Sequence, residues 1–306
     1  MSAPAVTASG LVHHFGPVKA VDGVDLEVRE NELFGVVGPD AAGKTTLLRL
    51  LVGVLVPDAG HATIHGLDLV KDRRKTRLLL GYMSQNFSLY QDLTIHENIR
   101  FFGSLRGVSA KDREARASRL LQATGLADFV KRQAGKLSGG MKQKLGLVCT
   151  LVHEPKVLFL DEPTNGVDPV SRREFWTILG ELRERITVIV TTPSLDEAER
   201  CDRVALMDQG KIFTVDTPQR LRDRVTRPVW EVEVDDPFHA AEALDVKLPN
   251  ASVQLFGDRL HVVCDIEADA LVALLGEQGL KASASRIAPS LEDAYVKLVS
   301  EQVAAA

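Results

Sequence analysis

One segment sets the architecture of this chain: Gly38-Pro39-Asp40-Ala41-Ala42-Gly43-Lys44-Thr45. It fits the pattern G-x-x-x-x-G-K-[ST]. The apolar run 32–37 before it predicts a buried strand, and the run 46–51 after it predicts the first turns of a helix. A strand, a glycine-rich turn and a helix N-terminus together present backbone N–H groups around a concave anion site. We therefore expect a nucleoside triphosphate site here.

Two side chains of this loop add specific chemistry. Lys44 is expected to reach the β- and γ-phosphates, and the Thr45 hydroxyl is placed to hold Mg²⁺. A purely structural glycine-rich turn is the alternative interpretation. The strand and helix predicted on either side of the motif favour the phosphate-binding one.

The composition of the 306 residues bounds the remaining possibilities. With 45% hydrophobic and 26% charged residues, it is that of an ordinary globular protein. The formal net charge of −5 argues against a nucleic-acid partner, which would favour a basic chain. Three scattered cysteines indicate a reducing compartment without a disulfide framework. The longest apolar run, 47–56, is too short to cross a bilayer, so any membrane role is expected to need a partner.

The order of predicted elements indicates two domains. Alternating apolar residues within 6–37 predict small antiparallel strands, and a strand–helix rhythm then follows the P-loop. This rhythm is interrupted by a helical block over about 94–136, in which Ile95, Ile99, Phe102 and Leu105 are predicted to share one apolar face. We predict an α/β domain over residues 1–225, with the helical block as its subdomain, and a separate α+β domain over residues 226–306.

Three further segments suggest nucleotide chemistry. The apolar strand predicted over 156–161 ends at the adjacent carboxylates Asp161 and Glu162; downstream of a P-loop they are expected near Mg²⁺ and the γ-phosphate. Gln85 ends another predicted strand, where its amide could approach the metal. Leu137-Ser138-Gly139-Gly140 opens a helix, and a serine with two glycines there could form a second anion site or an ordinary helix cap.

Taken together, these segments resemble the ATP-binding cassette of ABC transporters. The likeness covers about residues 6–225, and the L-S-G-G signature, placed between the P-loop and the Asp-Glu strand, is specific to that family. The segments 137–147 and Thr192-x-x-x-Asp196-Glu197-Ala198-Glu199 look most like bacterial drug-export cassettes that serve a separate permease. The resemblance implies a P-loop NTPase cassette with an antiparallel β-subdomain and a helical subdomain, followed by a small C-terminal α+β domain.

The resemblance also assigns roles by position. Glu162 corresponds to the general base and Gln85 to the metal-contacting Q-loop, while Thr45, Gln85 and Asp161 are the implied Mg²⁺ ligands. Phe15 corresponds to the aromatic residue that stacks on adenine. The implied ATP-binding residues are Phe15, Gly38, Pro39, Asp40, Ala41, Ala42, Gly43, Lys44, Thr45, Thr46, Ser138, Gly139, Gly140 and Asp168.

Two residues depart from the family pattern. Ala41 stands where glycine is usual, and a positive φ there would cost on the order of 1 kcal/mol. Pro193 replaces the switch histidine and has no side-chain donor. Losing a charge-assisted hydrogen bond of roughly 1.5–3 kcal/mol would slow hydrolysis about 10- to 100-fold.

The leading hypothesis is an ATPase subunit of an exporter that uses MgATP. The family resemblance implies transmembrane permease subunits, a second cassette of the same or a different chain, and a place on the inner face of the membrane. Two alternatives stay open. One is a regulatory cassette with little hydrolysis of its own, which Pro193 favours; the other is a soluble cassette ATPase without a transport role.

Overall fold

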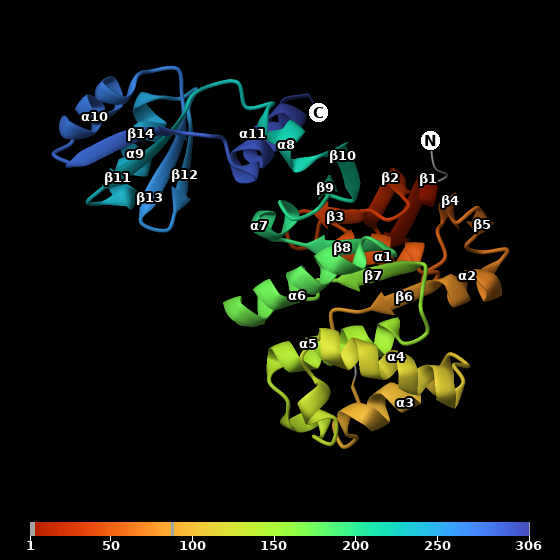
Figure 1. Ribbon diagram of the computed structural model, residues 1–306. Helices are drawn as coiled ribbons and strands as arrows, with labels where there is room; N and C mark the ends of the chain where they lie inside the picture. The colour runs from red at the N-terminus through yellow and green to blue at the C-terminus, as the bar shows by residue number, and fades with distance from the viewer. Residues whose placement is uncertain (1–3, 87–88, 306) are drawn as a thin grey trace. The chain divides into compact units, whose positions relative to one another are not determined.

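The computed structural model describes residues 4–86 and 89–305. The chain separates into two compact units, one ending at Val215 and the other beginning at Asp216 (Figure 1). The division falls ten residues before the boundary inferred from the sequence. Helix α8 (Pro218–Arg222) belongs with the second unit because it packs against α11 (Leu291–Ala305).

A six-stranded sheet forms the centre of the first unit, in the order β10-β9-β3-β8-β7-β6. The strands β3, β6, β7, β8 and β9 run parallel, and three of them are buried along their whole length, as expected for a sheet covered on both faces. Their carboxyl ends therefore meet at one edge. The bounds are β3 Leu33–Val37, β6 Leu80–Met83, β7 Val157–Asp161, β8 Thr187–Thr192, β9 Arg203–Asp208 and β10 Lys211–Asp216.

A second sheet, antiparallel and four-stranded, has the order β2-β1-β4-β5. Val24, Leu26 and Val28 of β2 are buried and the residues between them are not, which confirms the predicted alternation. The bounds are β1 Pro4–Phe15, β2 Val18–Arg29, β4 Ala59–Ile64 and β5 Leu67–Asp68.

Four helices accompany these two sheets. Helix α1 follows the P-loop, and its apolar residues Leu47, Leu48 and Leu51 are buried in the core that the two sheets share. The helix α6 begins at Pro169, whose fixed φ suits a first helical position. The bounds are α1 Lys44–Leu51, α2 Arg73–Leu79, α6 Pro169–Leu182 and α7 Leu195–Ala198.

The helical subdomain has its own core. It comprises α3 (Ile95–Leu105), α4 (Ala110–Ala123), two 3₁₀ turns and α5 (Gly139–Leu151). The start of α3 is fixed by a capping box: the Thr94 hydroxyl accepts from the Glu97 N–H, and the Glu97 carboxylate accepts from the Thr94 N–H. Ile95 and Ile99 are buried, but Leu105, predicted on the same face, is 71% exposed.

The second unit folds as β-α-β-β-α-β, the ferredoxin-like arrangement. Its antiparallel sheet has the order β12-β13-β11-β14, and α9 and α10 contribute Leu244 and Leu271 to the core that they share with the sheet. A capping box fixes the start of α11, since Ser290 and Asp293 exchange hydrogen bonds. The bounds are β11 Val229–Val234, α9 Pro237–Lys247, β12 Ser252–Phe256, β13 Arg259–Val263, α10 Ala268–Gly276 and β14 Ala282–Ile287.

The structure confirms the predicted α/β fold class, with its antiparallel and helical subdomains and the small α+β unit. Sequence analysis had not assigned β12, β14 or α9, because these short elements carry weak periodicity. Among the described residues, no helix is both long and apolar enough to cross a membrane.

Asn98 is a fully buried polar residue of the helical subdomain. Its side chain is fully buried, accepts a hydrogen bond from the Tyr90 N–H and donates to the carbonyls of Tyr90 and Leu93. We expect Asn98→Ala to lower the free energy of unfolding by about 2–4 kcal/mol, because the backbone groups that bond its fully buried side chain lose their partner. Urea unfolding followed by circular dichroism measures this, with Gln122→Ala, exposed on α4, as the control.

Candidate functional site

The P-loop joins the carboxyl end of β3 to the N-terminus of α1, as predicted. Two of its glycines allow contacts that no other residue could make. A Cβ on Gly38 would lie 2.0 Å from the Met207 carbonyl oxygen, and one on Gly43 would lie 2.2 Å from the Ala20 carbonyl oxygen. Gly43 also has a φ of 103°. The loop therefore packs directly against the backbones of β9 and β2.

Ala41 has a φ of 64°, in the left-handed region. The positive φ considered in the sequence analysis is therefore present, and Ala41 places a side chain at a position that favours glycine. The strain is on the order of 1 kcal/mol, and the hydrogen bond between the Ala42 N–H and the Pro39 carbonyl lies within the same turn.

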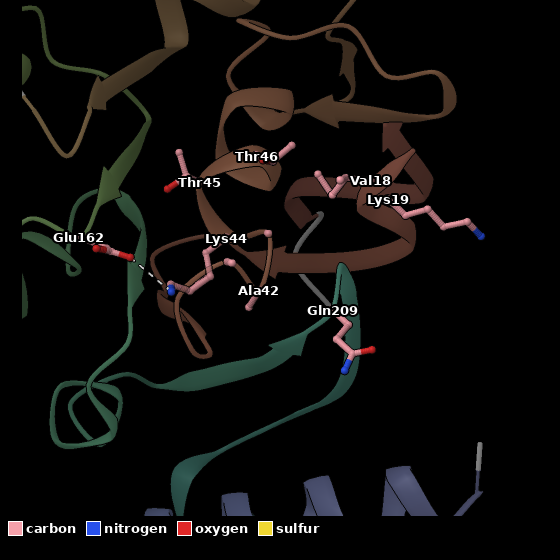
Figure 2. Close-up of a pocket in the computed structure, with 11 residues that line it drawn as sticks. Val18, Lys19, Ala42, Lys44, Thr45, Thr46, Glu162 and Gln209 are labelled. Carbon is pink, nitrogen blue, oxygen red and sulfur yellow. Dashed lines mark ion pairs between the residues drawn. The ribbon is translucent and has the colours of Figure 1, made fainter. Parts of the chain in front are cut away.

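A cavity of about 380 Å³ opens over this loop (Figure 2). Lys44 and Glu162 lie at one end of it, while Val18, Lys19 and Gln209 lie toward the other. The cavity is thus polar and charged where phosphates would sit. The described residues that line it are Val18, Lys19, Ala20, Ala41, Ala42, Gly43, Lys44, Thr45, Thr46, Glu162 and Gln209.

Lys44 is a buried cation at one end of the cavity. Its Nζ donates to the carbonyl oxygens of Gly38 and Pro39, each at 2.9 Å, and lies 3.3 Å from Glu162 Oε1. Only 4% of the lysine side chain is exposed, so its charge acts in a low-dielectric setting. This geometry suits the binding of a phosphate.

Asp161 ends β7 and contacts side chains from three other elements. Its carboxylate is fully buried and accepts from the hydroxyls of Thr45 on α1, at 2.9 Å, and Thr191 on β8, at 2.8 Å. The Tyr82 hydroxyl on β6 approaches its other oxygen at 3.5 Å. Burial and the neighbouring Asp161 charge raise the pKa of Tyr82, so this hydroxyl stays protonated.

The donors around Asp161 fit Mg²⁺. The Thr45 hydroxyl and the Asp161 carboxylate are hard oxygen ligands in contact with each other, at the mouth of a phosphate-binding loop. When bound, Mg²⁺ would neutralise phosphate charge.

Glu162 adopts a strained backbone conformation, with a φ of 46°. Its N–H donates to the Thr191 hydroxyl at 3.0 Å, which holds the residue at the end of β7. Its Oε2 accepts from the Gln85 amide at 3.0 Å and from the Asn165 amide at 3.4 Å. The carboxylate thus has two orienting donors and a lysine within 3.3 Å. An oriented carboxylate of this kind can act as a general base.

Gln85 lies in the turn that follows β6, two residues beyond the end of the strand that it was predicted to end. Its amide contacts Glu162, so it joins the predicted base to the segment that follows β6.

The signature segment lies on a different part of the first unit. The Ser138 hydroxyl caps α5 by accepting from the Met141 N–H, and both Ser138 and Gly139 are exposed. A Cβ on Gly140 would lie 2.4 Å from Ser171, so helices α5 and α6 meet there. Of the described residues that line the 380 Å³ cavity, none comes from this segment. The signature segment is therefore accessible to a second molecule.

Asp168 is likewise exposed and outside that cavity. It caps α6 by accepting from the N–H groups of Val170 and Ser171. The Ser171 N–H is the main reason that the pKa of Asp168 is lowered.

Phe15 ends β1 with half of its side chain exposed. The His13 ring packs edge-on against it, with the ring centroids 4.8 Å apart. Phe15 stands three residues before Val18, which lines the cavity. An exposed aromatic face here could stack on a base.

Pro193 lies at the carboxyl end of β8, beside a second cavity of about 260 Å³. Glu162 lines both cavities, so this second one borders the predicted base on its other side. The described residues that line it are Glu162, Thr164, Asn165, Arg172, Thr192, Pro193, Ser194 and Glu197.

Sequence reasoning missed several residues of this site. Thr191, Tyr82 and Asn165 contact the two carboxylates, and Gln209 lines the nucleotide cavity. Thr191 and Tyr82 could have been suspected because polar residues stand near the ends of buried strands. No local signal points to Gln209, whose hairpin approaches the loop only in three dimensions.

Comparison with known proteins agrees with this geometry. The family model described as "ABC transporter" matches residues 21–165. "Probable multidrug ABC transporter ATP-binding protein YbhF" of Escherichia coli (strain K12) is 48% identical over 72% of this chain and 39% of its own length. The chain thus spans about two fifths of that relative.

Two further matches cover more of the compared protein. "Daunorubicin resistance ATP-binding protein DrrA3" of Streptomyces coeruleorubidus is 34% identical over 98% of both chains. Among solved structures, "Structure of ATP binding subunit of ABC transporter" has a TM-score of 0.65 and 26% identity, and covers 72% of this chain and 92% of that one. On this evidence the chain belongs to the ABC transporter family, and its first unit is an ATP-binding cassette.

Proposed function

We propose that this chain binds and hydrolyses MgATP as the ATP-binding subunit of an exporter. One observation carries the proposal: Lys44, Thr45, Asp161 and Glu162 meet at the carboxyl edge of one parallel sheet, with a cavity of about 380 Å³ over them. Such an edge is where open α/β sheets bind their ligands.

In this proposal each residue has one task. Lys44 and the loop N–H groups hold the phosphates, and Thr45, Asp161 and Gln85 hold the metal. Glu162 accepts a proton from the attacking water, because its carboxylate is oriented by Gln85 and Asn165. Phe15 stacks on the adenine.

The proposal includes a second cassette. Ser138 and Gly139 are exposed and lie outside this chain's own nucleotide cavity. An exposed serine and glycines at a helix N-terminus suit the phosphates of ATP bound to another cassette. Asp168, also exposed, caps α6, which meets α5 at Gly140, and it would face the same partner.

The relatives support export as the function of this chain, because two of them carry "multidrug" and "daunorubicin resistance" in their names. The partner would be a separate transmembrane permease that holds this chain at the inner face of the membrane. The alternatives of a regulatory cassette or a non-transport ATPase gain no support from these relatives.

The permease would dock on the helical subdomain. Tyr90 and Phe101 are exposed with their ring centroids 4.6 Å apart, and Leu105 is 71% exposed beside them on α3. A hollow of about 610 Å³ lies here, lined in part by Leu105, Phe101 and Arg100. Tyr90 stands five residues after Gln85, whose amide contacts Glu162. Exposed aromatic and leucine side chains suit an apolar helix face.

We predict that Leu105→Arg detaches the chain from membranes that contain its permease. The arginine would place a charge in the apolar contact. Sedimentation of a tagged chain with the membrane fraction measures this. Val246→Arg is the control, because Val246 is 82% exposed on α9 in the second unit. Equal retention of wild type and Leu105→Arg would contradict this docking surface.

We predict that Lys44→Ala abolishes MgATP binding while the fold is retained, because the phosphates lose their main cation. Fluorescence titration with an ATP analogue measures this. Lys19→Ala serves as the control, since Lys19 also lines the cavity but is 63% exposed and lies at its other end. An unchanged affinity in Lys44→Ala would refute the nucleotide site.

The third expectation concerns Pro193. The structure places it beside a cavity that Glu162 also lines. Pro193→His should raise the rate of ATP hydrolysis about 10- to 100-fold without a matching change in affinity, because it restores a charge-assisted donor. Steady-state phosphate release from the assembled complex gives the rate. A rate at or below that of wild type would show that the proline is not limiting.

A further inference from the structure

A buried carboxylate that this mechanism does not use lies behind Glu162. Glu197 on α7 is only 6% exposed. One of its oxygens accepts from the Thr164 hydroxyl and the other from the Thr192 hydroxyl, each at 2.5 Å. Both oxygens are therefore occupied by threonines from two different segments of the chain.

These two segments are the ones that flank the reaction site. Thr164 stands two residues after Glu162, and Thr192 immediately precedes Pro193. The Thr192 hydroxyl also accepts from the Ser194 N–H at 3.0 Å, so its single proton is donated to Glu197. Glu197 thereby fixes the bend at Pro193 and the turn after Glu162 together.

The charge of Glu197 is balanced from a third element. Arg172 on α6 places its Nε 3.7 Å from Glu197 Oε1, and its Nη2 donates to the Val167 carbonyl at 3.5 Å. A buried carboxylate is retained when it is paired and its oxygens accept hydrogen bonds, and Glu197 meets both conditions. Arg172 and Glu197 line the 260 Å³ cavity that borders Glu162.

We propose that Glu197 is a positioning residue for ATP hydrolysis, and this rests on the function proposed above. Its carboxylate clamps the Glu162–Thr164 segment to the Thr192–Ser194 segment, so that the base and the loop at Pro193 keep one fixed separation. Pro193 offers no side-chain donor to the nucleotide. The loop at Pro193 is therefore held in place by this clamp.

The clamp predicts a specific kinetic signature. In the described contacts, the phosphate-binding residues Lys44 and Thr45 take no part in the Glu197 network. ATP binding should therefore survive loss of the clamp, whereas the rate of hydrolysis should fall because the base is displaced.

The test uses the full chain in its assembled complex. Glu197→Gln, Thr164→Val and Thr192→Val should each lower kcat by about tenfold or more, while the Kd for a fluorescent ATP analogue changes less than about twofold. Thr164→Ser and Thr192→Ser keep the hydroxyl and should restore kcat to within about threefold of wild type.

Glu32→Gln is the matched control. Glu32 is 5% exposed, pairs with Arg203 at 3.2 Å and accepts from the Arg29 N–H, but it precedes β3, at the opposite edge of the sheet. This substitution should lower stability without lowering kcat. If it lowers kcat as much as Glu197→Gln does, Glu197 has only a structural role and the proposal is overturned.

Amide hydrogen exchange tests the clamp without relying on hydrolysis. In Thr164→Val, the amide of Ser194 should exchange at least about fivefold faster, although the substitution lies in the other segment. Glu32→Gln should leave it unchanged. Unchanged exchange in Thr164→Val would overturn the clamp. A wild-type complex that fails to hydrolyse ATP would instead refute the proposed function, while the exchange result still decides whether the clamp exists.

Discussion

The buried carboxylate of Asp161 is the constraint on which the rest of the first unit depends. A charge without partners is costly in a protein interior, and Asp161 is fully buried. Its hydrogen bonds from Thr45 and Thr191, with Tyr82 near its other oxygen, join α1, β8 and β6 to the end of β7. The same contacts hold the phosphate-binding loop against the sheet edge, so the fold and the site share one set of interactions.

The chemistry follows from what lies next to this junction. Glu162 comes directly after Asp161, and its positive φ turns its carboxylate toward Lys44. The strain of that conformation is offset by hydrogen bonds from its own N–H and to its side chain. A second buried carboxylate, Glu197, sits on the far side of Glu162 and is balanced by Arg172. The predicted base thus lies between two networks that are anchored in different elements.

Local patterns in the sequence were sufficient for most of the first unit. The P-loop, the strand before it, the helix after it, the cap of α5 and the alternation in β2 all follow from short-range rules, and the structure confirms them. Leu105 departs from its predicted apolar face because the subdomain core ends one turn earlier, which leaves that side chain to solvent. The ferredoxin-like order of the second unit could not be predicted from local patterns, since β11 pairs with β14, about fifty residues further along the chain.

The sequence alone therefore determined the family of the chain, and it predicted which residues would carry the nucleotide chemistry. A motif such as G-x-x-x-x-G-K-T encodes its own local backbone, which needs no distant partner to be recognised. Only the tertiary structure decided how those residues are joined: that Gln85 and Asn165 orient Glu162, and that Glu197 links Thr164 to Thr192. The reason is physical, because these contacts bridge up to 77 residues of chain and arise from strand order, which local periodicity does not specify.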